Sequence, residues 1–264
     1  MTQQKLCAAL DTQLAAARGQ VCVLAAPLDG GTPLYERGAG RQAVSASTIK
    51  VFILLAALNE VRLGRLALDA PVAVTAADIL PDTRVFVDGP GMHPLEELLV
   101  WMIVLSDNTA TNVLIGLLGM DRVNAAAQSV GAQSTLLERK MLDWDAVAAG
   151  RNNYTSAADL LCVFRALYGE TVLTPELCAL ARSILRRQRD TGMLMRYIWQ
   201  DVPCAHKTGG LDHLCHDAGV FELPEKPYFI AVLIWDAPDI EGDEPLAGRI
   251  SKLVFDYYSG EDAQ

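Results

Sequence analysis

Hydrophobic residues recur at two different spacings along the chain, and the first stretch combines both. Leu6, Leu10 and Leu14 stand one helical turn apart, whereas residues 20–29 form a β-branched apolar run that ends in the turn sequence Asp-Gly-Gly at 29–31. We expect an N-terminal helix followed by a β-hairpin, whose second strand comes directly after the turn.

The middle of the chain, from residue 47 to about residue 200, follows helical spacing in nearly every segment. The segments expected to form helices are the run after Ser47 and residues 94–105, 109–119, 157–168 and 175–187. Near the C-terminus the spacing becomes that of strands in residues 202–210, 216–223 and 228–236, and an amphipathic helix is expected over residues 245–258.

This order of elements predicts an α/β plus all-α fold class. The expected architecture is a mostly antiparallel sheet built from both chain ends and flanked by helices, with an inserted helical domain. We expect residues 1–46 and 201–264 to form one discontinuous α/β sheet domain, and residues 47–200 to form an all-α domain. The groove where the two domains meet is the expected place for a functional site.

The composition indicates a globular protein that acts on small molecules. Of its 264 residues 51% are hydrophobic, which is enough for a sizeable core, and the formal net charge is −10. The chain holds no run of Lys and Arg long enough to form a basic patch. We therefore expect neither nucleic acid nor an anionic membrane surface among its partners.

Targeting and redox signals favour the cytoplasm. The first residues have helical spacing rather than the unbroken apolar core of a signal peptide, and the longest apolar run, residues 51–58, is too short to span a bilayer. The six Cys residues form no compact framework, so we expect buried thiols rather than disulfides. A cytoplasmic location is the expectation for the chain as given, and a removed leader is the alternative.

Candidate chemistry begins at Ser47 and Lys50, where a polar segment gives way to the long apolar run. Three positions apart on a helix, the two side chains lie on one face, one turn from each other. A Ser hydroxyl needs a base to become a nucleophile, and burial lowers the pKa of a Lys enough to provide one. The alternative is an ordinary helix N-cap followed by a solvated Lys.

Two further short motifs favour the active-site interpretation. Residues 106–108 (Ser-Asp-Asn) stand between two apolar helices, and residues 207–209 (Lys-Thr-Gly) lie on a predicted strand. The chance of finding all three motifs in this order is on the order of 10⁻⁵. Together they match the S-x-x-K, S-D-N and K-T-G signature of serine β-lactamases and penicillin-binding proteins, and the chain resembles class A β-lactamases over about its whole length.

The resemblance implies a role for each motif residue. Ser47 would be the acylated nucleophile, Lys50 would help to remove its proton, and Ser106 would relay a proton to the departing lactam nitrogen. The implied substrate-binding residues are Asn108 at the side-chain amide, Lys207 and Thr208 at the carboxylate, Gly209 through close approach of the strand, and Gly210 as the partner of the Ser47 N–H group in the oxyanion hole. The resemblance implies no cofactor and no metal.

One position departs from the family's pattern. If Arg139, Gly150 and Thr155 are matched to the corresponding residues of the family's loop, Met141 occupies the position of the glutamate that activates the deacylating water. Loss of a general base slows the step it serves by about 10²–10⁴-fold, so we expect the acyl-enzyme to persist. Substitute bases close by are Asp143 and Asp145, with Glu138 as a third candidate, and the alternative is that these are surface acids.

Structural roles are expected for a second cluster, for the Asp of the Ser-Asp-Asn motif and for two residues that follow this motif. Five possible zinc ligands, Cys204, His206, His213, Cys215 and His216, surround the Lys-Thr-Gly strand. Strand alternation places Cys204 and His206 opposite Lys207, so we expect hydrogen-bonded His and buried Cys rather than a metal site. Asp107 is expected to hold the turn between two helices, and Thr111 and Asn112 are expected on a helix surface.

Three functions fit these patterns. The first is a serine hydrolase that acts through an acyl-enzyme on β-lactams or related amides and esters, with slow deacylation. The second is a D,D-peptidase similar to the penicillin-binding proteins. The third is a covalent β-lactam sensor without turnover, which is motivated by Met141.

Overall fold

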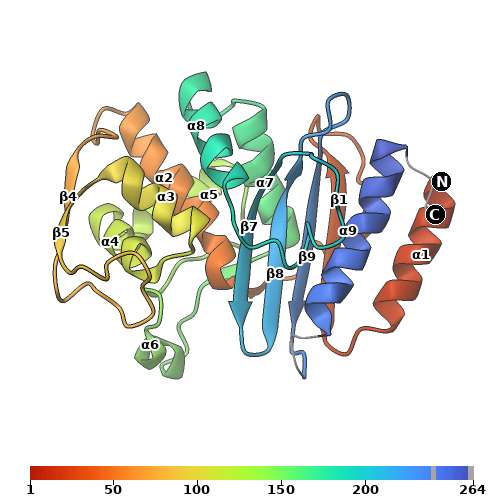
Figure 1. Cartoon of the computed structure of the whole chain (residues 1–264), viewed down its shortest axis with the longest axis horizontal. Coiled ribbons are helices and arrows are strands. Elements are labelled where there is room, and N and C mark those ends of the chain that lie inside the picture. Colours follow the sequence, from red (N-terminus) through yellow and green to blue (C-terminus); the bar gives the residue numbers. More distant parts are fainter. Residues whose placement is uncertain (239–241, 261–264) are drawn as a thin grey trace.

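The computed structural model describes residues 1–238 and 242–260 and contains a five-stranded antiparallel sheet in the order β2-β1-β9-β8-β7 (Figure 1). The strands are β1 (Gln20–Pro27), β2 (Tyr35–Arg37), β7 (Cys204–Leu211), β8 (Leu214–Phe221) and β9 (Tyr228–Trp235). The N-terminal hairpin joins the C-terminal strands because β1 pairs with β9 along its whole length. The expected sheet from both chain ends is confirmed.

Two helices from the chain ends cover one face of this sheet. Helix α1 (Gln3–Ala15) packs against α9 (Asp243–Ser259), and α9 contacts β8 and β9. Leu6, Leu10 and Leu14 are buried in the core that these helices share with the sheet. Figure 1 shows both helices on the right of the sheet, away from the remaining helices.

Helices from the middle of the chain cover the opposite face. Helix α7 (Ala157–Tyr168) contacts β1, β8 and β9, and α8 (Pro175–Arg186) contacts β7. Helix α2 (Lys50–Arg62) runs through the middle of this core, and every residue from 50 to 58 is buried. A helix that is buried all round reads as a continuous apolar run rather than as one apolar face. Its first residue is Lys50, whose amine therefore lies inside the protein.

Three more helices pack around α2: α3 (Leu95–Val104), α4 (Asn108–Leu118) and α5 (Met120–Ser129). The sequence patterns missed α5, because its buried residues are the small Ala126 and Ala127 together with Val123. Such a face is too weakly apolar for its helical spacing to be recognised in the sequence.

Short paired segments interrupt the predicted helical region. Strand β4 (Pro71–Val74) pairs with β5 (Gly91–Pro94), and β3 (Ala43–Val44) pairs with β6 (Tyr154–Thr155). Strands of two to four residues are too short to show a period. One hydrophobic core contains residues from α2 and from the sheet, so the boundaries proposed for two separate domains stay a prediction.

Two further expectations concern membranes and cysteines. Within the described ranges, no helix is long and apolar enough to cross a bilayer. All six Cys residues are free thiols, and four of them, Cys22, Cys178, Cys204 and Cys215, are buried.

Candidate active site

Ser47 lies in the 3-10 turn η1 (Ala46–Ile49) that leads into α2, and its side chain is half-buried. The preceding residue, Ala46, has a φ of +44°, an uncommon conformation for a residue with a Cβ atom. Such backbone strain persists where the surrounding structure holds it. Here the Ser45 N–H group donates to the Asn153 carbonyl at 2.9 Å.

Strand β7 approaches this turn closely at Gly209. A Cβ atom added to Gly209 would lie 3.0 Å from the backbone nitrogen of Ser47 and 3.1 Å from that of Thr48. A side chain at this position would push the strand and the turn apart by a few tenths of an ångström, so glycine permits their close approach. The next residue, Gly210, is exposed and lines the small pocket into which Ser47 opens.

His216, on strand β8, connects the sheet to the segment that precedes Ser47. Its Nδ1 atom accepts from the Ile234 N–H group at 3.1 Å, so Nε2 carries the proton and donates to the Val44 carbonyl at 3.0 Å. The side chain is fully buried, and burial lowers the pKa of His216 to about 4. His216 is therefore a neutral structural residue at physiological pH.

Lys50 is fully buried, which excludes the alternative of a solvated Lys. Its Nζ atom donates to the Ser106 carbonyl at 2.7 Å, to Ser106 Oγ at 3.2 Å and to Asn108 Oδ1 at 2.8 Å. Burial, and after it the charge of Lys207, lower the pKa of Lys50 well below its usual value. The Ser47 hydroxyl makes no hydrogen bond to any residue that the structure describes, Lys50 included.

Ser106 connects the two motif lysines. It lies between α3 and α4 with a φ of +54°, and its Oγ accepts from Lys50 Nζ at 3.2 Å and from Lys207 Nζ at 3.1 Å. A hydroxyl between two amines can pass a proton from one to the other or to a bound ligand.

The other two residues of the second motif have separate tasks. Asp107 Oδ1 accepts from the Ala110 N–H group at 2.8 Å and caps α4, in agreement with its predicted role at the turn. Asn108 accepts from Lys50 and donates through Nδ2 to Asp82 Oδ2 at 2.6 Å. Asp82 lies in the long connection between β4 and β5, and no motif or spacing pointed to it.

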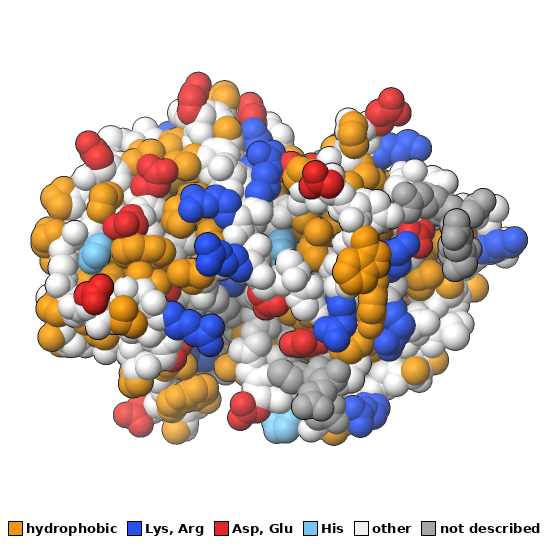
Figure 2. Space-filling model, viewed as in Figure 1, with side chains coloured by type: hydrophobic (Ala, Val, Ile, Leu, Met, Phe, Trp, Pro, Cys, Tyr) orange, Lys and Arg blue, Asp and Glu red, His pale blue; other side chains and the backbone are white. Residues whose placement is uncertain are grey.

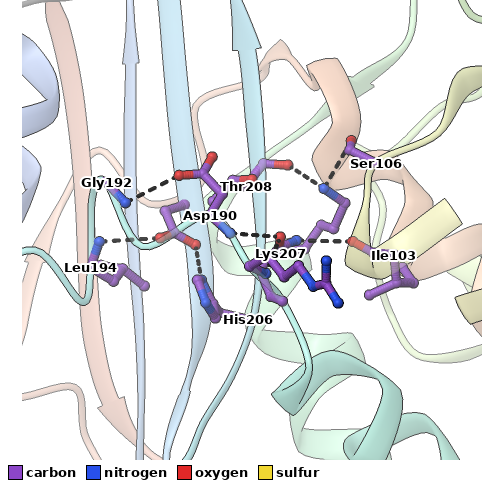
Figure 3. Close-up of polar contacts among 11 residues, drawn as sticks. Ile103, Ser106, Asp190, Gly192, Leu194, His206, Lys207 and Thr208 are labelled. Carbon is purple, nitrogen blue, oxygen red and sulfur yellow. Dashed lines mark hydrogen bonds and ion pairs between the residues drawn. The ribbon is translucent and has the colours of Figure 1, made fainter. Parts of the chain in front are cut away.

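Lys207 is fully buried on β7 and points toward Ser106, as Figure 3 shows. Its amine also donates to the Thr208 carbonyl at 2.9 Å. Burial lowers the pKa of Lys207 to about 8, although the charges of Asp217 and Asp190 oppose this shift. Thr208 is buried beside it.

A polar network on the other side of β7 stabilises this strand (Figure 3). Asp217 Oδ1 lies 2.9 Å from His206 Nδ1, and Asp217 Oδ2 accepts from the Leu194 N–H group at 3.1 Å. Leu194 and Gln188 both belong to the connection between α8 and β7. Gln188 Nε2 donates to the Ile103 carbonyl at 2.9 Å and so links this connection to the end of α3. The connection after α8 thus holds the sheet and the helices together beside Lys207.

The cysteine and histidine cluster is used structurally. His206 contacts Asp217, His213 Nδ1 lies 2.9 Å from the Ala237 carbonyl, and Cys204 and Cys215 are buried thiols. In the described part of the chain, no group of three or more His, Cys, Asp and Glu is placed to hold a metal ion.

Met141 lies in the wall of the pocket beside Ser47, and only 8% of its surface is exposed. Asn112 Oδ1 accepts from the Met141 N–H group at 2.7 Å, and Asn112 Nδ2 donates to the Met141 carbonyl at 3.0 Å. The prediction that Asn112 and Thr111 lie on a helix surface is wrong: Thr111 is fully buried. The spacing could have revealed Asn112, because it stands one helical turn after Asn108 on the same face.

The three candidate substitute bases lie elsewhere. Asp143 Oδ1 accepts from the Ala146 N–H group at 3.0 Å and caps the short helix α6 (Trp144–Ala148). Asp145 is exposed and Glu138 is half-buried, and none of the three lines the pocket of Ser47. Their replacement of the missing glutamate stays a prediction.

Two buried amines, those of Lys50 and Lys207, belong to the site although the whole chain is acidic. Figure 2 shows Lys and Arg side chains, with Asp and Glu side chains among them, along the middle of the face in view. The buried amines of Lys50 and Lys207 favour an anionic ligand at the site.

Comparison with known proteins gives consistent matches in sequence. A family model described as "Beta-lactamase enzyme family" matches residues 5–258. A β-lactamase of Rhodobacter capsulatus is 35% identical over 203 residues, which cover 74% of this chain and 68% of that protein. The D-alanyl-D-alanine carboxypeptidase DacB2 of Mycobacterium tuberculosis is 31% identical over 156 residues, which cover 56% of this chain and 50% of that protein.

Solved structures give the same fold. A β-lactamase from Sphaerobacter thermophilus is similar with a TM-score of 0.88 and 25% identity, and the match covers 100% of both chains. A mutant of PBP-A, described as an acyl-enzyme complex with penicillin G, has a TM-score of 0.86 and 24% identity, with 98% of this chain and 96% of that chain covered.

Proposed function

Because this chain belongs to the beta-lactamase enzyme family, we propose that it forms an ester on Ser47 with β-lactams or related amides and hydrolyses that ester slowly. The observation that carries the proposal is the pair of buried lysines on one hydroxyl: Lys50 and Lys207 both donate to Ser106 Oγ. Such an arrangement supplies a neutral amine, a proton relay and a cation within one site.

Acylation follows from the lowered pKa of Lys50. In its neutral form Lys50 takes the proton of the Ser47 hydroxyl, and Oγ forms a bond to the carbonyl carbon of the substrate. The backbone N–H groups of Ser47 and Gly210 stabilise the oxyanion. The C–N bond then breaks, and Ser106 passes the proton from Lys50 to the departing nitrogen.

Substrate binding is assigned to the groups around this centre. Lys207 carries a positive charge below its pKa of about 8 and, with the Thr208 hydroxyl, would hold the substrate carboxylate. Asn108 would donate to the acyl amide through the second N–H of Nδ2, while the first donates to Asp82.

Slow deacylation is proposed because Met141 lines the pocket where a base would be needed. A thioether accepts no proton near neutral pH, and the loss of a general base slows the step it serves by about 10²–10⁴-fold. The acyl-enzyme would therefore accumulate whenever acylation is faster than this residual hydrolysis.

A second candidate is a D,D-peptidase that acts on D-alanyl-D-alanine peptides. The observation in its favour is the similarity to a D-alanyl-D-alanine carboxypeptidase over 56% of this chain. Both reactions use the same Ser47 ester, so they differ in the substrate and in the fate of the ester. A covalent sensor without turnover would stop at the ester.

The experiment compares a chromogenic cephalosporin, benzylpenicillin and an acyl-D-alanyl-D-alanine peptide as substrates of the wild type and of Ser47→Ala. Sustained hydrolysis of the cephalosporin supports the first candidate, and release of D-alanine supports the second. An adduct without turnover favours a sensor. Equal activity of the two proteins would remove Ser47 from the mechanism.

A further inference from the structure

Arg139 is a buried cation in the wall of the pocket into which Ser47 opens. Only 6% of its surface is exposed. Among the described residues that line this pocket, Arg139 is the only one with a charged side chain. Lys207 does not line it, so the two cations face different parts of a bound substrate.

The contacts of the Arg139 guanidinium are all to neutral groups. Nε donates to Asn152 Oδ1 at 2.9 Å, Nη1 donates to the Lys140 carbonyl at 3.0 Å, and the group lies 5.9 Å from the centre of the Trp144 ring. Within the described ranges, no carboxylate forms an ion pair with Arg139, and Nη2 makes no hydrogen bond.

The nearest carboxylate does not compensate this charge. Asp143 attracts the guanidinium from beyond ion-pair distance, while its own Oδ1 accepts from the Ala146 N–H group at 3.0 Å. Burial outweighs Asp143 and lowers the pKa of Arg139 from its ordinary value. A buried cation without an anionic partner is destabilising for the protein, and a bound anion would remove that cost.

We propose that Arg139 binds a carboxylate on the acyl part of the substrate and thereby selects acyl groups that carry a negative charge. This inference rests on the proposed function, because it concerns the group transferred to Ser47. The free Nη2 donor and the open pocket allow a charge-assisted hydrogen bond to such a carboxylate. The preferred substrate then carries two anionic groups, one for Lys207 and one for Arg139.

The test measures the second-order rate constant of Ser47 acylation by intact-protein mass spectrometry. Two matched pairs of compounds serve as probes. The first is carbenicillin with benzylpenicillin, which lacks the side-chain carboxylate, and the second is a pair of acyl-D-alanyl-D-alanine peptides that share a free C-terminus and differ in whether the acyl group carries a carboxylate or a carboxamide. In the wild type we expect the anionic member to react at least about tenfold faster in one pair or both.

Asn152→Asp is the matched variant. Both side-chain hydrogen bonds that the structure gives Asn152 end on Oδ1, which accepts from Arg139 and from the Asn153 N–H group at 2.9 Å. An Asp at this position keeps both bonds and neutralises Arg139. We expect it to abolish the preference and to leave unchanged the rate with the compounds that lack a carboxylate on the acyl part. Arg139→Gln should lose the preference as well, and thermal unfolding reports whether that variant still folds.

Two results would overturn the inference separately from the proposed function. Equal acylation of Ser47 by both members of each pair removes the role of Arg139 and leaves the proposed function intact. A preference that persists undiminished in Asn152→Asp assigns the selection to another residue. If no compound acylates Ser47 at all, the proposed function and the role of Arg139 fail together.

Discussion

The side chain of Asn112 holds Met141 by both of its backbone polar groups, with Oδ1 accepting from the N–H group at 2.7 Å and Nδ2 donating to the carbonyl at 3.0 Å. These two hydrogen bonds attach the loop that contains Met141 to helix α4, close to the Ser-Asp-Asn motif. The Met141 side chain consequently stays in the wall of the Ser47 pocket, where a proton acceptor would be needed for hydrolysis of an ester.

A base introduced at this position is predicted to accelerate deacylation. Since Asn112 bonds only the backbone of residue 141, Met141→Glu keeps both hydrogen bonds and places a carboxylate in the pocket. We expect the deacylation rate constant to rise by about 10²–10⁴-fold, as measured by the loss of the penicillin adduct in a mass-spectrometric time course.

Met141→Gln is the control for this experiment, because it has the size and polarity of Glu without a basic carboxylate. An equal acceleration by Gln would show that pocket polarity, rather than a base, limits the reaction. No acceleration by Glu would mean that the position does not reach the hydrolytic water.

Asn112 is predicted to stabilise the loop rather than to take part in chemistry. Asn112→Ala leaves the N–H and carbonyl groups of Met141 without these partners, which costs on the order of 1–3 kcal/mol in the free energy of unfolding. Hydrogen exchange should become faster at the backbone amides around Met141. A variant with unchanged unfolding and unchanged exchange at these amides would contradict the structural role.

Much of the fold could be predicted from the sequence, since long elements such as α2 and β9 carry strong patterns. The short pairs β3–β6 and β4–β5 escaped because a few residues show no period. In the site, Ser47, Lys50, Ser106 and Lys207 follow from motifs with fixed spacing. The contact of Asp82 with Asn108 depends on the path of a long loop, for which single residues give no signal.

The hydroxyl of Ser106 is predicted to matter for chemistry and not for stability. Ser106 has a φ of +54°, a conformation that glycine adopts more readily than serine. Ser106→Gly relieves this strain but also removes an acceptor from two buried amines, so its unfolding temperature should change little. Acylation of Ser47 should slow by roughly 10²-fold or more because the proton relay is lost. Full activity of this variant would remove Ser106 from the relay, and its unfolding at room temperature would contradict the argument from backbone strain.

The pH dependence of acylation is predicted to have two limbs. Lys50 acts as a base only when neutral, so the rate rises as the pH rises through its lowered pKa. Lys207 holds a carboxylate only when charged, so the rate falls as the pH rises through about 8. The measurement is the second-order rate constant for acylation by benzylpenicillin across this range.

Asp82→Asn separates the two limbs. The charge of Asp82 raises the pKa of Lys50 and is not among the causes that shift Lys207. Its removal should therefore move the acidic limb to lower pH and leave the alkaline limb in place. A shift of the acidic limb to higher pH would contradict the assignment of that limb to Lys50.

The most direct test of the account is to mix the protein with benzylpenicillin and follow the intact mass and the site of modification over time. We expect a covalent adduct on Ser47 that outlasts the free antibiotic, and no adduct in Ser47→Ala. Rapid and complete hydrolysis with no detectable adduct would contradict slow deacylation, and modification at a residue other than Ser47 would contradict the proposed nucleophile.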